Sequence, residues 1–252
     1  LIIRGLIVGI LAGLLAFGWA RTFGEASVAA GIAYEEQTSA KEQAAAVAAG
    51  QPAAPEEPEI VSRENQSGLG LLTGTVGLGA GLGCLFGVLF AFGNGRMGMG
   101  PGPTAVALAA IGLVTVYVVP GLKYPANPPG TNEGDTIAFR TGLYFLMMAI
   151  SVAATIAGLL LRKKLSVQMG SWNGSLVAAA VYLLVIVAAF LIIPGYNETP
   201  EDFKATTLWE FRMASFGIQT VLWMSLGVFF GIASEMASKS SSRMPAGTPA
   251  MS

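Results

Sequence analysis

The sequence contains no histidine and only one cysteine in 252 residues, so it nearly lacks the side chains that most often hold transition metals. A lone cysteine cannot form an internal disulfide, and Cys84 lies in an apolar run, where a buried structural thiol is expected. The sequence has no Walker motif, no nucleophile beside a base and no CxxC spacing. These absences argue against an enzyme.

Charged residues are also scarce, at 12% of the sequence against about 25% in soluble domains. Hydrophobic residues make up 53%, and the mean hydropathy is +0.62. The chain is therefore expected to be an integral membrane protein, with the lipid bilayer as its main partner. Its net charge of -1 gives no reason to expect nucleic acid as a partner.

Six windows have the length and apolar character of membrane spans, which need about 20 predominantly apolar residues each. They predict an all-α, polytopic membrane helix bundle that forms a single transmembrane domain over residues 1–236. The first window, which follows Arg4, could instead be a signal peptide, but the weak small-residue pattern after it favours an uncleaved span. The predicted spans are approximately residues 2–20, 68–92, 103–120, 138–161, 175–194 and 209–235.

Positive charges predict the orientation of these spans. A very short loop holds Arg162, Lys163 and Lys164, which are expected in the cytoplasm together with both termini. The loop of residues 21–67 is then extracytoplasmic. Its alanine-rich half favours an exposed helix, and its proline- and glutamate-rich half favours an extended linker. The polar tail, residues 237–252, is predicted to be disordered.

A short internal repeat is visible before the later spans. Pro120-Gly121, a proline-rich acidic loop and the segment IAFR, which ends at Arg140, resemble Pro194-Gly195, a similar loop and the segment EFR, which ends at Arg212. The segment IVSR, which ends at Arg63, precedes the second span in the same way. We predict three outward-pointing helical hairpins, made by spans one and two, three and four, and five and six, with these arginines at comparable depths.

The second span is the richest in glycine, and several of its glycines recur at four-residue spacing. Small residues on one helix face allow a neighbouring helix to approach closely, so this span is expected at a tight helix contact. The glycines that carry this prediction are Gly70, Gly74, Gly79, Gly83 and Gly87.

Charged residues gather next to the outer ends of the predicted spans. Arg140 and Arg212 each precede an apolar run, and they predict either interfacial anchors or a polar mouth at the end of the bundle. In the second case Glu133, Asp135 and Glu210 would supply oxygen ligands that attract a metal cation, while the arginines orient them. In the first case the anchors would join an aromatic belt of Trp209, Tyr124 and Tyr144.

The middles of the spans contain no Asp, Glu, His, Lys or Arg. Proton relays and carboxylate sites within the membrane depend on such residues. The sequence therefore argues against a self-sufficient proton-driven pump.

The loop KYPANPPGTNEGDT, residues 123–136, differs from everything around it. Its prolines stiffen the chain, and residues before a proline are biased toward extended conformations. With the following IAFRTGLY, it resembles the signature region of the bacterial family of probable cobalt transporter subunits, CbtA. The segments RGLIVGILAGLLAFGWARTFGE, EIVSRENQSGLGLLTG and LWEFRMASFGIQTVLW are similar to that family in kind and order. The loop positions singled out are Lys123, Tyr124, Pro125, Asn127 and Pro128.

The resemblance implies a multi-pass membrane subunit for cobalt uptake in the bacterial plasma membrane. It also implies a small, single-span, histidine-bearing partner, CbtB, and Co²⁺ as a transported ion, with no cofactor indicated. Two functional hypotheses remain. In one, the chain forms or supports the path of the cation, with acidic outer loops at its entrance. In the other, it is a structural or accessory subunit of a larger membrane complex that does not itself transport.

Overall fold

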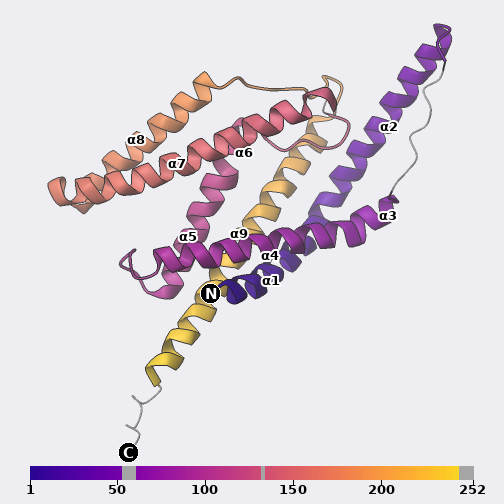
Figure 1. Cartoon of the computed structure of the whole chain (residues 1–252). Coiled ribbons are helices and arrows are strands. Elements are labelled where there is room, and N and C mark those ends of the chain that lie inside the picture. Colours follow the sequence, from indigo (N-terminus) through magenta and orange to yellow (C-terminus); the bar gives the residue numbers. More distant parts are fainter. Residues whose placement is uncertain (53–60, 132–133, 244–252) are drawn as a thin grey trace, which may run out of the picture. The chain divides into compact units, whose positions relative to one another are not determined.

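The computed structural model describes residues 1–52, 61–131 and 134–243, with only the backbone of Asp135 and of residues 240–243. Within these ranges every regular element is helical and no strand occurs (Figure 1). Six helices are long and apolar enough to cross a membrane, which confirms the predicted all-α class and the number of spans. They are Ile2–Ala48, Arg63–Gly93, Pro101–Lys123, Ile137–Met169, Ser171–Ile192 and Ala205–Lys239.

Several of these long helices are assembled from shorter elements, because π-helical turns interrupt them. A helix satisfies its own backbone hydrogen bonds, which is why long apolar segments fold this way in hydrocarbon. In chain order the elements are α1 (Ile2–Trp19), η1 (Ala20–Gly24), α2 (Glu25–Ala48), α3 (Arg63–Asn65), η2 (Gln66–Gly70), α4 (Leu71–Gly93), α5 (Pro101–Gly112), η3 (Leu113–Val118), α6 (Val119–Lys123), η4 (Gly134–Thr136), α7 (Ile137–Met169), α8 (Ser171–Ile192) and α9 (Ala205–Arg243).

The segments that flank the apolar spans are helical over much of their length. Helix α2 continues from α1 through the π-helical turn η1, and it comprises the alanine-rich segment for which the sequence favours a helix. Most of the proline- and glutamate-rich linker, residues 53–60, lies outside the described residues. Helix α9 continues to Arg243, so the first residues of the predicted tail are helical. Residues 244–252 lie outside the described part of the chain.

The chain packs into two compact units. The first consists of Leu1–Arg21, Val61–Ile111 and Ile218–Ser252, and the second of Thr22–Ile60 and Gly112–Gly217. Helix α9 and the helices that begin with α1 and α5 therefore contribute residues to both units. This division concerns packing and leaves the predicted single transmembrane domain, residues 1–236, as a prediction.

In the first unit, α1 and α4 lie side by side along rows of glycine (Figure 1). A Cβ atom at Gly83 would overlap the carbonyl oxygen of Gly5, and one at Gly79 would overlap that of Gly9. The two backbones are therefore in direct contact, as small-residue rows permit. Gly87 continues the row, with its Cα facing the backbone of Leu1.

The first unit also has an aromatic cluster between α4 and the carboxyl-terminal part of α9. The rings of Phe86 and Phe230 pack edge to face with centroids 5.2 Å apart, and Phe90 lies 4.9 Å from Phe230. All three rings are buried. The Arg4 guanidinium lies 6.0 Å from the centroid of Phe230 and donates a hydrogen bond of 3.0 Å to Ser234 Oγ. These contacts join α1, α4 and α9.

In the second unit, α7 packs along α8 (Figure 1). The two helices are joined at Gly170, whose positive φ of 82° suits a residue without a side chain. Their buried core includes Met147, Ala154, Ile186 and Ala189, and Val119 of α6 packs in the same cluster. This core supports the loops at the opposite end of the two helices from Gly170.

Some of the helix contacts join spans within one predicted hairpin, and others join spans of different predicted hairpins. The pairs α1 with α4 and α6 with α7 join consecutive spans of the predicted first and second hairpins, whereas α7 with α8 joins spans four and five. The three-hairpin arrangement and the cytoplasmic placement of both termini therefore stay predictions.

Candidate functional site at the paired loops of the second unit

Two loops meet at one end of the second unit. Loop A, residues 124–136, connects α6 to α7, and loop B, residues 193–204, connects α8 to α9. Pro120-Gly121 lies in α6, just before loop A, and Pro194-Gly195 lies at the start of loop B, so the internal repeat relates the two loops. Proline fixes φ and removes a backbone N–H donor. The prolines in loops A and B therefore favour a non-helical backbone, whose carbonyl groups can accept hydrogen bonds from side chains.

Arg140, near the start of α7, binds loop B, and Arg212, near the start of α9, binds loop A. Arg140, on α7, forms an ion pair with Glu198 of loop B, with 2.9 Å between Nη1 and Oε2. Arg212, on α9, donates hydrogen bonds to loop A, from Nε to Ala126 O at 3.3 Å and from Nη2 to Asn127 Oδ1 at 2.8 Å. The two contacts are reciprocal, and each fastens one loop to the helix that follows the other.

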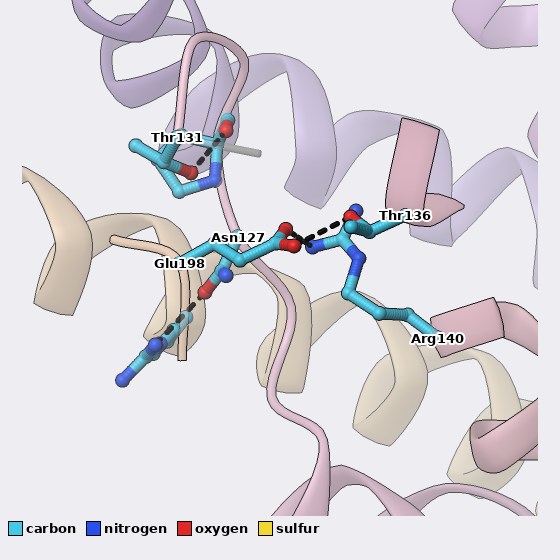
Figure 2. A network of polar contacts seen from close by, with 7 residues as sticks. Asn127, Thr131, Thr136, Arg140 and Glu198 are labelled. Atoms are coloured by element: carbon cyan, nitrogen blue, oxygen red, sulfur yellow. Dashed lines mark hydrogen bonds and ion pairs between the residues drawn. The ribbon is translucent and has the colours of Figure 1, made fainter. Parts of the chain in front are cut away.

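Glu198 is held at both of its carboxylate oxygens. Oε2 pairs with Arg140, and Oε1 accepts a hydrogen bond from the Thr136 hydroxyl at the start of α7, as Figure 2 shows. The Glu198 side chain is only 7% exposed, and that of Arg140 is 21% exposed. A buried carboxylate needs such partners, because an unpaired charge out of water is costly.

Lys123 and Tyr124 fasten the start of loop A to the end of α8. Lys123 Nζ donates to Phe190 O at 2.7 Å and lies 6.0 Å from the centre of the Phe190 ring. The Tyr124 hydroxyl donates to Pro194 O at 2.7 Å, and burial raises the pKa of this phenol. Both side chains satisfy carbonyls near the carboxyl-terminal end of a helix, where such groups lack partners within the helix.

Helix α2 covers both loops. A Cβ atom at Gly31 would lie 2.9 Å from Pro129 O of loop A, which explains why this position has no side chain. Tyr34 donates a hydrogen bond of 2.6 Å to Asp202 of loop B, and its ring packs edge to face against Phe203. The helix predicted to be exposed therefore packs on one side against the loop pair, although most of its residues are exposed.

The middle of loop A is closed by its own hydrogen bond. Thr131 is 1% exposed and donates from its hydroxyl to Pro128 O at 2.7 Å (Figure 2). Between them, Gly130 has a φ of 74°, and a Cβ atom there would lie 2.8 Å from that of Glu35 on α2. The KYPANPPG segment thus ends in a tight turn under α2, with Pro128 buried.

A cavity of about 660 Å³ lies among these groups. Its wall combines four tyrosine rings with polar groups from both loops. Of the described residues, three with charged side chains line it, namely Arg140, Arg212 and Glu198, which gives two positive charges and one negative. The remaining lining residues are Tyr117, Gly121, Tyr124, Pro125, Ala126, Asn127, Thr141, Tyr144, Tyr196 and Asn197.

The structure brings together many of the loop residues that the sequence singled out. Arg140, Arg212, Tyr124, Pro125 and Asn127 all line the cavity. Lys123 and Pro128 are not among the residues that line it, and they contact Phe190 and Thr131 instead. Arg63 belongs to α3 in the first unit.

The predicted metal-binding trio is only partly visible. Glu210 is exposed on α9 and does not line the cavity. Glu133 and the side chain of Asp135 lie outside the described part of the structure, so the prediction for these three residues is not tested. Among the side chains that are described, no group of three or more His, Cys, Asp or Glu is arranged to hold a metal ion.

The predicted packing glycines divide into two sets. Gly79, Gly83 and Gly87 face α1, as described above. Gly74 has open space beside its Cα, and the nearest group to Gly70 is the carbonyl of Asn65 in the preceding turn.

Sequence reasoning missed Glu198, the carboxylate at the centre of the loop contacts. It stands in the second of the two corresponding loops, three residues after Gly195. The one sequence signal for Glu198 is the similarity between the two loops, because that similarity singles out the residues that follow both proline-glycine pairs.

Six long apolar helices, with loops fastened to one another around a polar cavity, define a multi-pass membrane protein. The sequence model of the CbtA family, described as probable cobalt transporter subunit, matches residues 1–235, and the chain belongs to this family. Comparisons with curated proteins and with solved structures gave no match. The family assignment confirms the resemblance seen in the loop and span segments.

Proposed function

We propose that this chain is the membrane subunit of a cobalt uptake system in the bacterial plasma membrane, where it forms or supports the path of the cation and does no enzymatic chemistry. The observation that carries the proposal is the family match over residues 1–235. Six apolar helices suit this role, because helices satisfy their own backbone hydrogen bonds in the bilayer and can enclose a path between them.

In this proposal the acidic outer residues Glu133, Asp135 and Glu210 attract the cation. Carboxylate oxygens bind Co²⁺ weakly and with little selectivity, whereas imidazole binds it better. These residues would therefore raise the local cation concentration and leave selection to another component.

That component would be a small, single-span, histidine-bearing partner of the CbtB kind. The family description as a subunit supports a partner of some kind. The absence of histidine from this sequence supports assigning the nitrogen ligands to the partner.

A second candidate is a structural or accessory subunit of a larger membrane complex. The reciprocal contacts of Arg140 with Glu198 and of Arg212 with Asn127 favour it, because they hold two loops in a fixed arrangement. The positive balance of charge among the described lining residues of the cavity also favours it, since a cation path is expected to be lined by acceptors.

Uptake of radioactive cobalt decides between the two. Cells without their own cobalt uptake would express this chain, the candidate partner, or both. The first proposal expects uptake that requires this chain, with Glu133→Gln, Asp135→Asn and Glu210→Gln each lowering the rate at low cobalt and low ionic strength, by about tenfold together. Glu36→Gln, at an exposed position of α2, is the matched control and should leave uptake unchanged.

The outcomes separate the candidates. The accessory role would be established if cobalt uptake does not depend on the chain and the chain is recovered in a larger membrane complex. Chain-dependent uptake that none of the three carboxylate substitutions alters would retain the transport role and remove the proposed acidic entrance.

A further inference from the structure

The charge of Arg212 is not balanced within the part of the chain that the structure describes. Its guanidinium donates to a backbone carbonyl, Ala126 O, and to a neutral amide oxygen, Asn127 Oδ1. Among the described side chains, none of its contacts is with a carboxylate. Arg212 nevertheless lines the cavity and is partly buried.

Among the described residues, Glu198 is the one carboxylate in the cavity wall, and it is already engaged. Arg140 takes one of its oxygens and Thr136 the other. Its negative charge therefore compensates Arg140, and the described lining residues leave a net positive charge at the Arg212 side. A partly enclosed cation with unused N–H donors is a site that favours an anion, because the low dielectric around it strengthens the attraction.

The remaining wall suits a small organic molecule. The volume of about 660 Å³ lies within the range of about 300–1,000 Å³ typical of ligand pockets. The hydroxyls of Tyr117, Tyr124 and Tyr144 are bonded to Ser215 Oγ, Pro194 O and Val116 O, so the rings serve mainly as apolar walls. Asn127 and Asn197 add amide groups at the loop side.

We propose that this cavity binds an anionic ligand, which places a carboxylate or phosphate group on the guanidinium of Arg212. Arginine suits this role because its planar fork of donors matches both groups. The inference goes beyond the transport proposal and does not depend on it, since it concerns binding by the cavity and not movement of cobalt.

The anion has two possible sources with the same chemistry, a soluble organic acid and the phosphate of a phospholipid headgroup. The purified full-length chain would be placed in nanodiscs of phosphatidylcholine, and in a second preparation in nanodiscs that also contain phosphatidylglycerol. Citrate would be titrated into each and binding measured by calorimetry. Saturable citrate binding in phosphatidylcholine is the expected result.

The two lipid preparations then identify the source. Equal citrate affinity in both supports a soluble organic anion as the occupant. Weaker citrate binding in the presence of phosphatidylglycerol, through competition, supports the lipid phosphate. Both results retain the anion site, and the absence of saturable citrate binding in phosphatidylcholine overturns it.

Substitution of Arg212 tests whether its guanidinium binds the anion. Arg212→Gln keeps a donor for Asn127 but removes the charge, and it should weaken citrate binding by about ten- to a hundredfold, as expected for loss of a charge-assisted hydrogen bond. Arg21→Gln, at an exposed arginine of η1, is the matched control and should bind citrate like the wild-type chain. Equal affinity for Arg212→Gln and Arg21→Gln would overturn the assignment.

A second pair of variants leaves the loop contacts intact. Thr141 is exposed on α7 and lines the cavity, so a longer side chain at this position can be accommodated there. Thr141→Glu would supply the missing negative charge and should abolish citrate binding, whereas Thr141→Gln, of the same size, should retain most of it. If the two variants bind citrate equally, charge does not govern the cavity and the proposal fails.

Discussion

At the scale of single residues, the ion pair between Glu198 and Arg140 fastens loop B to α7. Glu198→Gln would keep an acceptor for Thr136 but remove the charge that compensates Arg140. We expect a loss of about 1.5–3 kcal/mol in the free energy of unfolding, the typical contribution of a hydrogen bond to a charged group. Thermal unfolding in detergent would measure it.

The matched control is Glu201→Gln, an exposed glutamate in the same loop. Its effect should stay within about 0.5 kcal/mol, as for other surface substitutions. In the double variant with Arg140→Gln, the losses should not add, because the two residues share one interaction. Additive losses would show that the pair does not act as a unit.

At the scale of the helices, the glycine row between α1 and α4 can be tested with two substitutions of the same kind on one helix. Gly83→Leu would force a side chain into the Gly5 backbone, and we expect a loss of about 1–3 kcal/mol or more from overpacking. Gly74→Leu has open space beside it and should fold normally. Unfolding temperature and monodispersity in detergent would compare them, and equal behaviour would contradict this packing.

The contact of α2 with loop A gives another prediction at this scale. Gly31→Leu would push against Pro129 and Pro128, so α2 should separate from the loop pair. We expect faster hydrogen exchange of the α2 amides in this variant, because local opening becomes easier. Ala29→Leu, at an exposed position of the same helix, should leave exchange unchanged. Equal exchange in the two variants would show that this contact does not hold α2.

The helices were largely predictable from the sequence, whereas their partners were not. Apolar length is a local property, so all six spans were found. The spacing of Gly79, Gly83 and Gly87 indicated a tight contact, but Gly74 shares that spacing and has no neighbour. Which glycines are covered depends on the position of α1, and a non-local pairing of this kind cannot be read from one helix.

The candidate site shows the same limit. Arg140 and Arg212 stood out because both precede apolar runs in a repeated context. Glu198 did not stand out from Glu201, since both are acids in one polar loop. Only the fold makes one of them buried and paired and leaves the other exposed.

At the scale of the whole molecule, the loop contacts constrain the topology. Each loop binds the helix that follows the other loop, so we expect both loops on the same side of the membrane. Helices α7 and α8 begin and end at these loops and are joined at Gly170. The turn at Gly170 is therefore expected on the opposite side. Arg162, Lys163 and Lys164, predicted from the sequence to lie in a short loop, lie instead in the last turns of α7 before Gly170, because the helix continues to Met169. The positive-inside rule predicts the cytoplasm for this end of α7.

Cysteine labelling tests this orientation, because the chain has a single native cysteine that can be replaced. In a Cys84→Ala background, Lys164→Cys and Glu201→Cys each place one thiol at an exposed position. The first position precedes α8 in the chain and the second follows it. A membrane-impermeant maleimide should label Glu201→Cys in intact cells, and Lys164→Cys only after permeabilisation. The reverse pattern would invert the orientation. Labelling of both in intact cells would mean that α8 does not cross the membrane, and the six-span topology would then be wrong.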